Sequence, residues 1–162
     1  MAKGLAVRMG APLFESDEYF HIPSDPPYQR QRPVEERLRL LKCDLGPCPT
    51  WVLSGCVAGW GEDPGIAYSL VVFLYLPLPL RSERLRRREE ARFGARILPG
   101  GDMHRIHEEF MEWTAGYDSG ASGGGNTLPA HRAFLDGVGC PVLRLETAMT
   151  PEEQLAAVLA AL

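Results

Sequence analysis

The chain has 162 residues, 45% of them hydrophobic and 23% charged, a composition typical of one soluble globular domain. Its net charge of −4 argues against binding to bulk nucleic acid or to acidic membranes. The longest apolar run, residues 69–80, is shorter than the roughly 20 residues that span a bilayer. No signal-peptide pattern opens the sequence and the four cysteines form no CxxC pair, so we expect free thiols and a cytoplasmic protein.

The first part of the chain predicts a helix, a strand and a second helix. Residues 2–9 are typical of a helix that ends at Gly10, and residues 13–16 are typical of a short buried strand. A proline-rich loop over residues 21–32 leads to a helix that starts at Pro33 and repeats apolar residues at helical spacing.

The remaining elements continue this alternation. In chain order we expect a strand over 51–54, an apolar strand over 70–75 covered on both faces, a basic helix over 80–92, a helix capped by Asp102, a glycine-rich loop over 120–126, a helix over 128–138, a strand over 140–145 and a final helix. Thr150 and Glu153 form a capping-box pattern before that last helix. This order predicts a three-layer α/β fold with a mostly parallel sheet, in one domain covering residues 1–162.

Ligands of such sheets bind outside the carboxyl ends of the strands. Asp17 and Glu18 follow the first strand, and Ser54 with Gly55 ends the second. A carboxylate at such a place can contact magnesium through water or accept a proton from a substrate hydroxyl. The alternative is that these carboxylates cap a helix or lie in a solvated turn.

A run of arginines follows the apolar strand. Its members are Arg81, Arg84, Arg86, Arg87, Arg88, Arg92 and Arg96. Arginine binds phosphate through a planar fork and stays charged near neutral pH, so the run could hold a polyphosphate or contact RNA phosphates. The alternative is a solvated helix face on which these side chains pair with Glu83, Glu89 and Glu90.

Two further groups carry weaker signals. His104 and His107 share a helix face, so a metal site is conceivable, but HEXXH is absent and no fourth ligand is evident. Surface histidines and helix capping by Asp102 are the favoured interpretation. Aromatic residues that could stack on a base or ring are more often part of the core; they are Tyr19, Phe20, Tyr28, Trp60, Trp113 and Tyr117.

Several stretches together resemble a known family. In order they are GAPLFESDEYF, RPVEERLRLL, WVLSGCVAGWG, LVVFLYLP, RLRRREEARFGARILPGGDMHRIHEEFMEW, YDSG and CPVLRLE. They cover nearly the whole chain and resemble small bacterial P-loop proteins of the adenylate-kinase-like or AAA-type ATPase kind. More distantly, the layout is similar to shikimate, gluconate and nucleoside-monophosphate kinases. The long stretch over residues 84–113 is the most specific.

The resemblance implies roles for individual residues. Asp17, with Glu15 or Glu18 nearby, corresponds to the acidic group that faces the phosphoryl acceptor, and Ser54 with Gly55 to the turn beside that substrate. Arg84 and Arg88 correspond to the start of a lid over about residues 84–103. Arg92 and Arg96 lie on the same lid, which closes over the phosphates of the nucleotide.

The family's phosphate-binding loop is missing from these residues. No GxxxxGK[ST] motif occurs, and neither lysine, Lys3 or Lys42, lies in a glycine-rich loop. Because residues 2–9 resemble the second half of the helix that follows such a loop, we expect a misassigned start site. The alternative is a relative that has lost the loop. Without the strand before the loop, the strands at Trp51 and Leu70 should leave a gap or collapse onto each other.

These interpretations lead to one expected function and two alternatives. The expected function is magnesium-dependent phosphoryl transfer from ATP to a small-molecule acceptor, with the present residues alone inactive. No metal ligand set from the protein alone is expected, apart from a possible Mg contact of Asp17, and neither nucleic acid nor a membrane is an expected partner. The alternatives are a non-catalytic anion- or nucleotide-binding relative and, third, an RNA-phosphate binder. Nucleoside, nucleotide and small sugar acid all remain open as acceptors, as does the oligomeric state.

Overall fold

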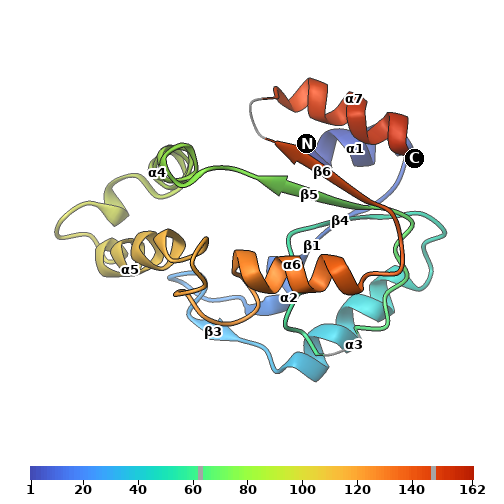
Figure 1. Cartoon of the computed structure of the whole chain (residues 1–162). Coiled ribbons are helices and arrows are strands. Elements are labelled where there is room, and N and C mark those ends of the chain that lie inside the picture. Colours follow the sequence, from blue (N-terminus) through green and yellow to red (C-terminus); the bar gives the residue numbers. More distant parts are fainter. Residues whose placement is uncertain (62–63, 147–148) are drawn as a thin grey trace. The chain divides into compact units, whose positions relative to one another are not determined.

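The computed structural model describes residues 1–61, 64–146 and 149–162 as a mixed α/β chain (Figure 1). The chain divides into two compact units. We call Met1–Tyr75 with Gly137–Leu162 the α/β unit, and Leu76–Asp136 the helical unit. No helix in the described ranges has the length and apolar character needed to cross a membrane.

The α/β unit opens with the predicted helix and strand. Helix α1 (Ala2–Met9) ends at Gly10, whose φ of 60° is the left-handed conformation that favours glycine. Strand β1 (Leu13–Glu15) pairs in parallel with β4 (Val52–Ser54). Helix α2 (Ser16–Phe20) follows β1 directly, and α3 (Val34–Leu45) packs against α2.

The segment between α2 and α3, expected as an ordered loop, also contains a short antiparallel strand pair. It contains strands β2 (His21–Ile22) and β3 (Arg30–Gln31), which pair antiparallel. The Arg32 guanidinium donates hydrogen bonds to the carbonyls of Glu18, Tyr19 and His21 at 2.9, 3.3 and 2.5 Å. The prolines had favoured a loop, but these bonds from one side chain hold the segment's two ends together.

A second parallel pair lies in the same unit. Strand β5 (Val71–Tyr75) pairs with β6 (Val142–Glu146) along its full length. The expectation that β5 is covered on both faces is wrong, because its Leu74 is 40% exposed. Helix α7 (Pro151–Ala161) then begins with the predicted capping box between Thr150 and Glu153.

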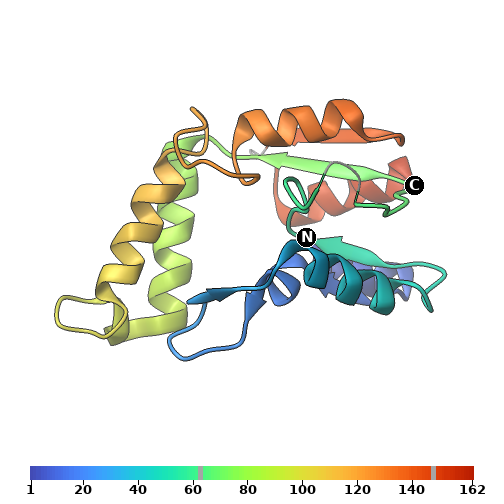
Figure 2. The same cartoon turned by 90° about the horizontal axis from the view of Figure 1, so that it is seen from below.

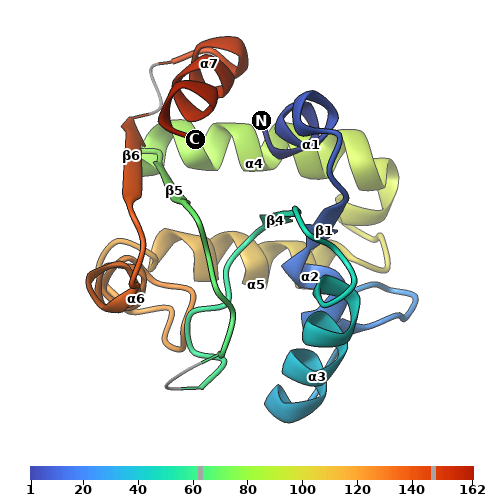
Figure 3. The same ribbon diagram turned by 90° about the vertical axis from the view of Figure 1, so that its right-hand side faces the viewer.

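One apolar core joins the two parallel pairs. Val52 of β4 and Leu145 of β6 belong to the same buried cluster as Leu5 and Val158. Helices α1 and α7 contact one another and cover these strands (Figure 3). Within the described residues, β4 and β5 nevertheless share no backbone ladder, so the sheet is split into two-stranded halves.

The helical unit consists of α4 (Leu78–Phe93), the 3-10 helix η1 (Gly94–Ile97), α5 (His104–Ala115) and α6 (Leu128–Gly137). Helices α4 and α5 pack side by side (Figure 2). Gly94 ends α4 as predicted. Asp102 does not cap α5, however, because Met103 is the N-cap residue and the Asp102 carboxylate instead binds Arg96.

Candidate functional site

The ends of strands β1 and β4 bring two predicted substrate residues together. The strands are parallel, and their last register partners are Glu15 and Ser54. Asp17 and Glu18 follow β1 within the first turn of α2, where their side chains are exposed. Among the described residues the Asp17 carboxylate has neither a hydrogen bond nor an ion pair. The acidic group and the Ser54–Gly55 turn therefore lie at the same end of one strand pair.

A close contact fixes the turn after β4. Ser16 is buried, and its hydroxyl accepts a hydrogen bond from the Cys56 backbone N–H at 3.1 Å. Gly55 has a φ of 101°, and a Cβ built on it would collide with the Ser16 hydroxyl. Glycine is thus required at this position both by its backbone conformation and by its neighbour. Ser16 was not among the predicted site residues, because nothing in the local sequence marks it.

Arg37 is a second residue that sequence reasoning missed. It is only 7% exposed, and its guanidinium carbon lies 3.8 Å from the centre of the Phe20 ring and 5.7 Å from that of Trp60. A signal was available in the sequence. Arg37 stands three residues after Val34 and four before Leu41, which places it on the apolar face of α3.

Further aromatic rings continue from Phe20, the ring that packs on this arginine. The rings of Phe20 and His21 have centroids 4.7 Å apart, and those of His21 and Tyr28 are 4.9 Å apart in an edge-on arrangement. The pKa of His21 is lowered, mainly by burial; the charge of Asp17 raises it and that of Arg37 lowers it further. The Phe20 ring thus contacts both Arg37 and His21 at the end of the short helix that carries Asp17.

Helix α2 is anchored to α3 beneath this site. The Tyr19 hydroxyl donates a hydrogen bond to the Asp44 carboxylate at 2.8 Å. Burial and this bond together raise the pKa of Tyr19, so the phenol stays protonated throughout the physiological range. The bond holds the helix that carries Asp17 in a fixed position on α3.

The predicted lid arginines lie in the helical unit. Arg84, Arg88 and Arg92 are exposed on α4, and Arg96 follows in η1. Arg88 binds Glu89 at 3.0 Å, and Arg96 binds both carboxylate oxygens of Asp102, the shorter contact being 2.7 Å. Within the described ranges Arg84 has no ion pair. Arg84, Arg88 and Arg92 are thus exposed, and Arg88 and Arg96 each bind a carboxylate in this structure.

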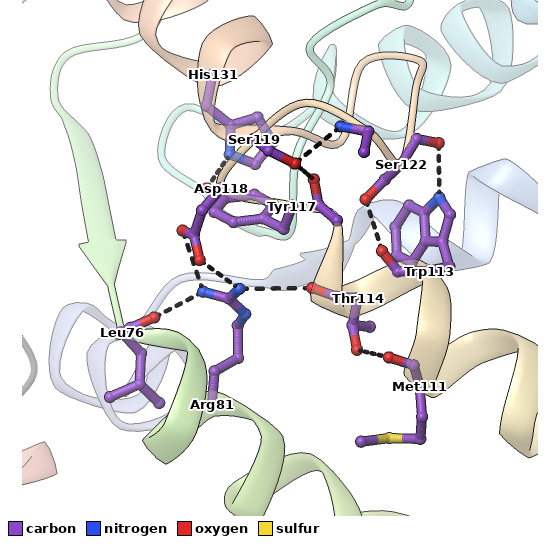
Figure 4. A network of polar contacts seen from close by, with 12 residues as sticks. Leu76, Arg81, Met111, Trp113, Thr114, Tyr117, Asp118, Ser119, Ser122 and His131 are labelled. Atoms are coloured by element: carbon purple, nitrogen blue, oxygen red, sulfur yellow. Dashed lines mark hydrogen bonds and ion pairs between the residues drawn. The ribbon is translucent and has the colours of Figure 1, made fainter.

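A polar network around Arg81 connects α4 with the end of α5 (Figure 4). Arg81 donates to both oxygens of Asp118, the shorter bond being 2.9 Å, and to the carbonyls of Leu76 and Thr114. Its guanidinium also lies 4.8 Å from the centre of the Tyr117 ring. The Arg81 guanidinium thus binds groups of the protein itself, and these bonds join α4 to the end of α5.

The described residues contain no group of three or more His, Cys, Asp or Glu side chains placed to hold a metal ion. Of the two histidines weighed as metal ligands, His107 has a buried Nδ1 without a hydrogen-bond partner among the described residues, and His104 contacts other groups. His104 lies beside the Ile97 carbonyl, with its Nδ1 at 3.0 Å, and its Nε2 is 3.6 Å from Glu108.

The comparison with known proteins identifies one relative. The chain is 35% identical over 159 residues to YqaC of Bacillus subtilis (strain 168), which is described as an uncharacterized protein. The match covers 98% of this chain and 87% of YqaC. The chain belongs to the YqaC family. No model of a protein family and no solved structure matches it.

Proposed function

We propose that the chain contributes the acceptor site and the lid of an ATP- and magnesium-dependent phosphotransferase of the nucleoside- and nucleotide-kinase type. The observation that carries the proposal is the parallel register of β1 and β4, with Glu15 opposite Ser54 at their carboxyl ends. That is where ligands bind in parallel α/β sheets. The exposed carboxylate of Asp17, which has no partner among the described residues, stands at the same end and can accept a proton from an acceptor hydroxyl.

In this proposal each predicted residue has one role. Asp17 is the general base or a magnesium contact, and Glu15, Glu18, Ser54 and Gly55 line the acceptor site. Arg84 and Arg88, with Arg92 and Arg96, neutralise the charge that develops on the transferred phosphoryl group. ATP supplies the phosphoryl group, and Mg²⁺ bridges its phosphate oxygens.

The split sheet is a second point in favour. The P-loop kinase-like fold of the resemblance is a three-layer structure whose mostly parallel sheet has the strand before the phosphate loop at its centre. In this chain β4 and β5 share an apolar core but no backbone ladder within the described residues. One further parallel strand between them would use both open edges and join the two halves into one sheet.

These 162 residues contain no GxxxxGK[ST] motif, so they lack the backbone N–H groups and the lysine that hold the phosphates of ATP. The proposal therefore predicts weak magnesium-ATP binding and no phosphoryl transfer by these residues alone. The test compares them with the longest in-frame form of the gene, by calorimetry with magnesium-ATP and by ADP release with a panel of acceptors. Micromolar ATP binding by the 162 residues, or no ADP release by a longer form that contains the motif, would refute the proposal.

The lack of that motif favours one alternative, a non-catalytic relative that binds an anion or a nucleotide. Under this alternative the longest in-frame form also lacks a phosphate loop, and the chain binds its ligand without turnover. Sequencing of the gene upstream of the Met1 codon separates the two functions before any assay.

A further inference from the structure

The charge on Arg37 is buried, and no carboxylate of the described residues pairs with it. The side chain is more than nine-tenths buried, and within the described ranges no carboxylate forms an ion pair with it. Its Nε donates a hydrogen bond to the Arg32 carbonyl at 2.7 Å. The two terminal nitrogens have no hydrogen-bond partner among the described residues, and neither of them is sealed from solvent.

Aromatic packing fixes the plane of this guanidinium. Phe20 covers one face at 3.8 Å, and the buried Trp60 lies 5.7 Å away. Cation–π contacts offset part of the cost of removing the charge from water, but they provide no acceptors for its N–H groups. Burial also lowers the pKa of Arg37, although a guanidinium remains charged at neutral pH. The result is a rigid cation whose terminal edge has no hydrogen-bond acceptor among the described residues.

We infer that the terminal edge of Arg37 binds an anionic group of the phosphoryl acceptor, a carboxylate or a phosphate. The acceptor is then a nucleotide or a sugar acid and not a neutral nucleoside. The identification of the bound molecule as the phosphoryl acceptor rests on the proposed function. The location of the bound molecule follows from Phe20, whose ring contacts both the Arg37 guanidinium and the His21 ring at the end of the short helix that carries the proposed base Asp17.

Two physical reasons favour an anion at this edge. Guanidinium binds carboxylate and phosphate through two parallel hydrogen bonds, which are stronger than bonds between neutral groups. The loss of side-chain freedom has moreover already occurred in the folded chain, so binding does not incur this cost again. A neutral ribose or base offers no charge to the same edge.

The experiment measures binding to the 162-residue chain by calorimetry and thermal shift, without ATP. The probes are inorganic phosphate, adenosine 5′-monophosphate, D-gluconate and adenosine. We expect phosphate and at least one of the two organic anions to bind, and adenosine not to bind. The organic anion that binds distinguishes a nucleotide site from a sugar-acid site. Arg37→Met should weaken anion binding by about 10- to 100-fold, the usual effect of losing a charged hydrogen-bonding partner.

Two variants serve as controls. Arg39→Met makes the same substitution at an exposed position of α3 and should leave anion binding unchanged. Arg37→Lys keeps the charge but loses the fork, and should weaken binding less than Arg37→Met. Without ligand, Arg37→Met should unfold within a few degrees of the wild-type chain, because relief of the buried charge offsets the loss of the hydrogen bond to the Arg32 carbonyl and of the contact with Phe20.

Several results would overturn the inference. They are no binding of any of the three anions, equal binding of adenosine and its monophosphate, unchanged anion binding by Arg37→Met, or collapse of the fold in that variant. None of them depends on catalysis. If anions bind through Arg37 but no form of the protein transfers phosphate, the kinase proposal fails alone. If phosphoryl transfer is found and Arg37→Met leaves anion binding unchanged, this inference fails alone.

Discussion

The Ser16 hydroxyl accepts a hydrogen bond from the Cys56 backbone N–H at 3.1 Å, and this bond joins the ends of strands β1 and β4. Gly55 lies between these partners with a φ of 101°. Gly55→Ala should therefore lower the free energy of unfolding by about 3 kcal/mol or more, because it adds a steric clash with Ser16 to the strain of a positive φ. Denaturant unfolding measures this change.

The matched control for that prediction is Gly61→Ala. Gly61 has a similar φ of 114°, but a Cβ there meets no atom of the described, non-adjacent residues within 4 Å. Only backbone strain remains, so the expected loss is about 1–2 kcal/mol. Ser16→Ala should recover part of the loss in the Gly55→Ala background. Equal costs for the two glycine variants would show that the Ser16 contact does not constrain the turn.

A different prediction concerns the two carboxylates that bind arginine in the helical unit. Asp118 and Arg81 are 31% and 16% exposed, whereas Asp102 and Arg96 are more open. Asp118→Asn should destabilise the chain by about 1–3 kcal/mol, since it leaves a largely buried guanidinium without its counter-charge. Asp102→Asn should have little effect, because exposed pairs contribute little. Thermal unfolding of both variants measures this difference. An equal loss of stability in the two variants would contradict the prediction.

Stability should fall on mild acidification. Burial lowers the pKa of His21 and of His131 below the ordinary value of 6.5. Each imidazole therefore stays neutral in the folded chain at a pH where the unfolded chain is already protonated. The unfolded state binds more protons, so the stability present above about pH 6.5 declines as the pH falls below it. Denaturant unfolding across this range should show the decline, and His21→Gln should reduce its slope. A slope unchanged by His21→Gln would contradict this assignment.

The proposed lid predicts a face-specific effect on α4. Arg84 and Arg88 are four residues apart and share one face of the helix, while Arg86 lies on the opposite face. In a form that turns over ATP, Arg84→Ala with Arg88→Ala should lower kcat by at least about tenfold through lost charge stabilisation. Arg86→Ala should leave kcat unchanged. A similar fall in kcat in the double variant and in Arg86→Ala would indicate a general effect of charge and not a phosphate-binding face.

The parts of this structure that were predictable from the sequence depend on neighbours in the chain. The Thr150–Glu153 capping box and the helix end at Gly94 need only residues within one or two turns, and both were predicted. The exposure of Leu74 was not, because a continuous apolar run predicts a strand without showing how many strands flank it. Here β5 has a single strand partner among the described residues.

The candidate site shows the same limit. The acidic turn and the Ser54–Gly55 turn were predicted from their places at strand ends, and the register of β1 with β4 brings them together. Arg37 was missed, although its spacing from Val34 and Leu41 placed it on the apolar face of α3. Its surroundings depend on Trp60, which comes from a distant part of the chain. Hydrophobic periodicity reveals that a charge is buried, but not what lies against it.

The most direct test is the kcat of the Asp17→Asn variant. It is measured in the longest in-frame form of the protein that transfers phosphate from ATP. Asn keeps the size of the side chain but cannot accept the acceptor's proton, so kcat should fall by about 100-fold or more. Glu112→Gln, an equivalent change at an exposed site on α5, should retain full turnover. Unchanged turnover in Asp17→Asn would contradict the assignment of this strand end as the site of phosphoryl transfer.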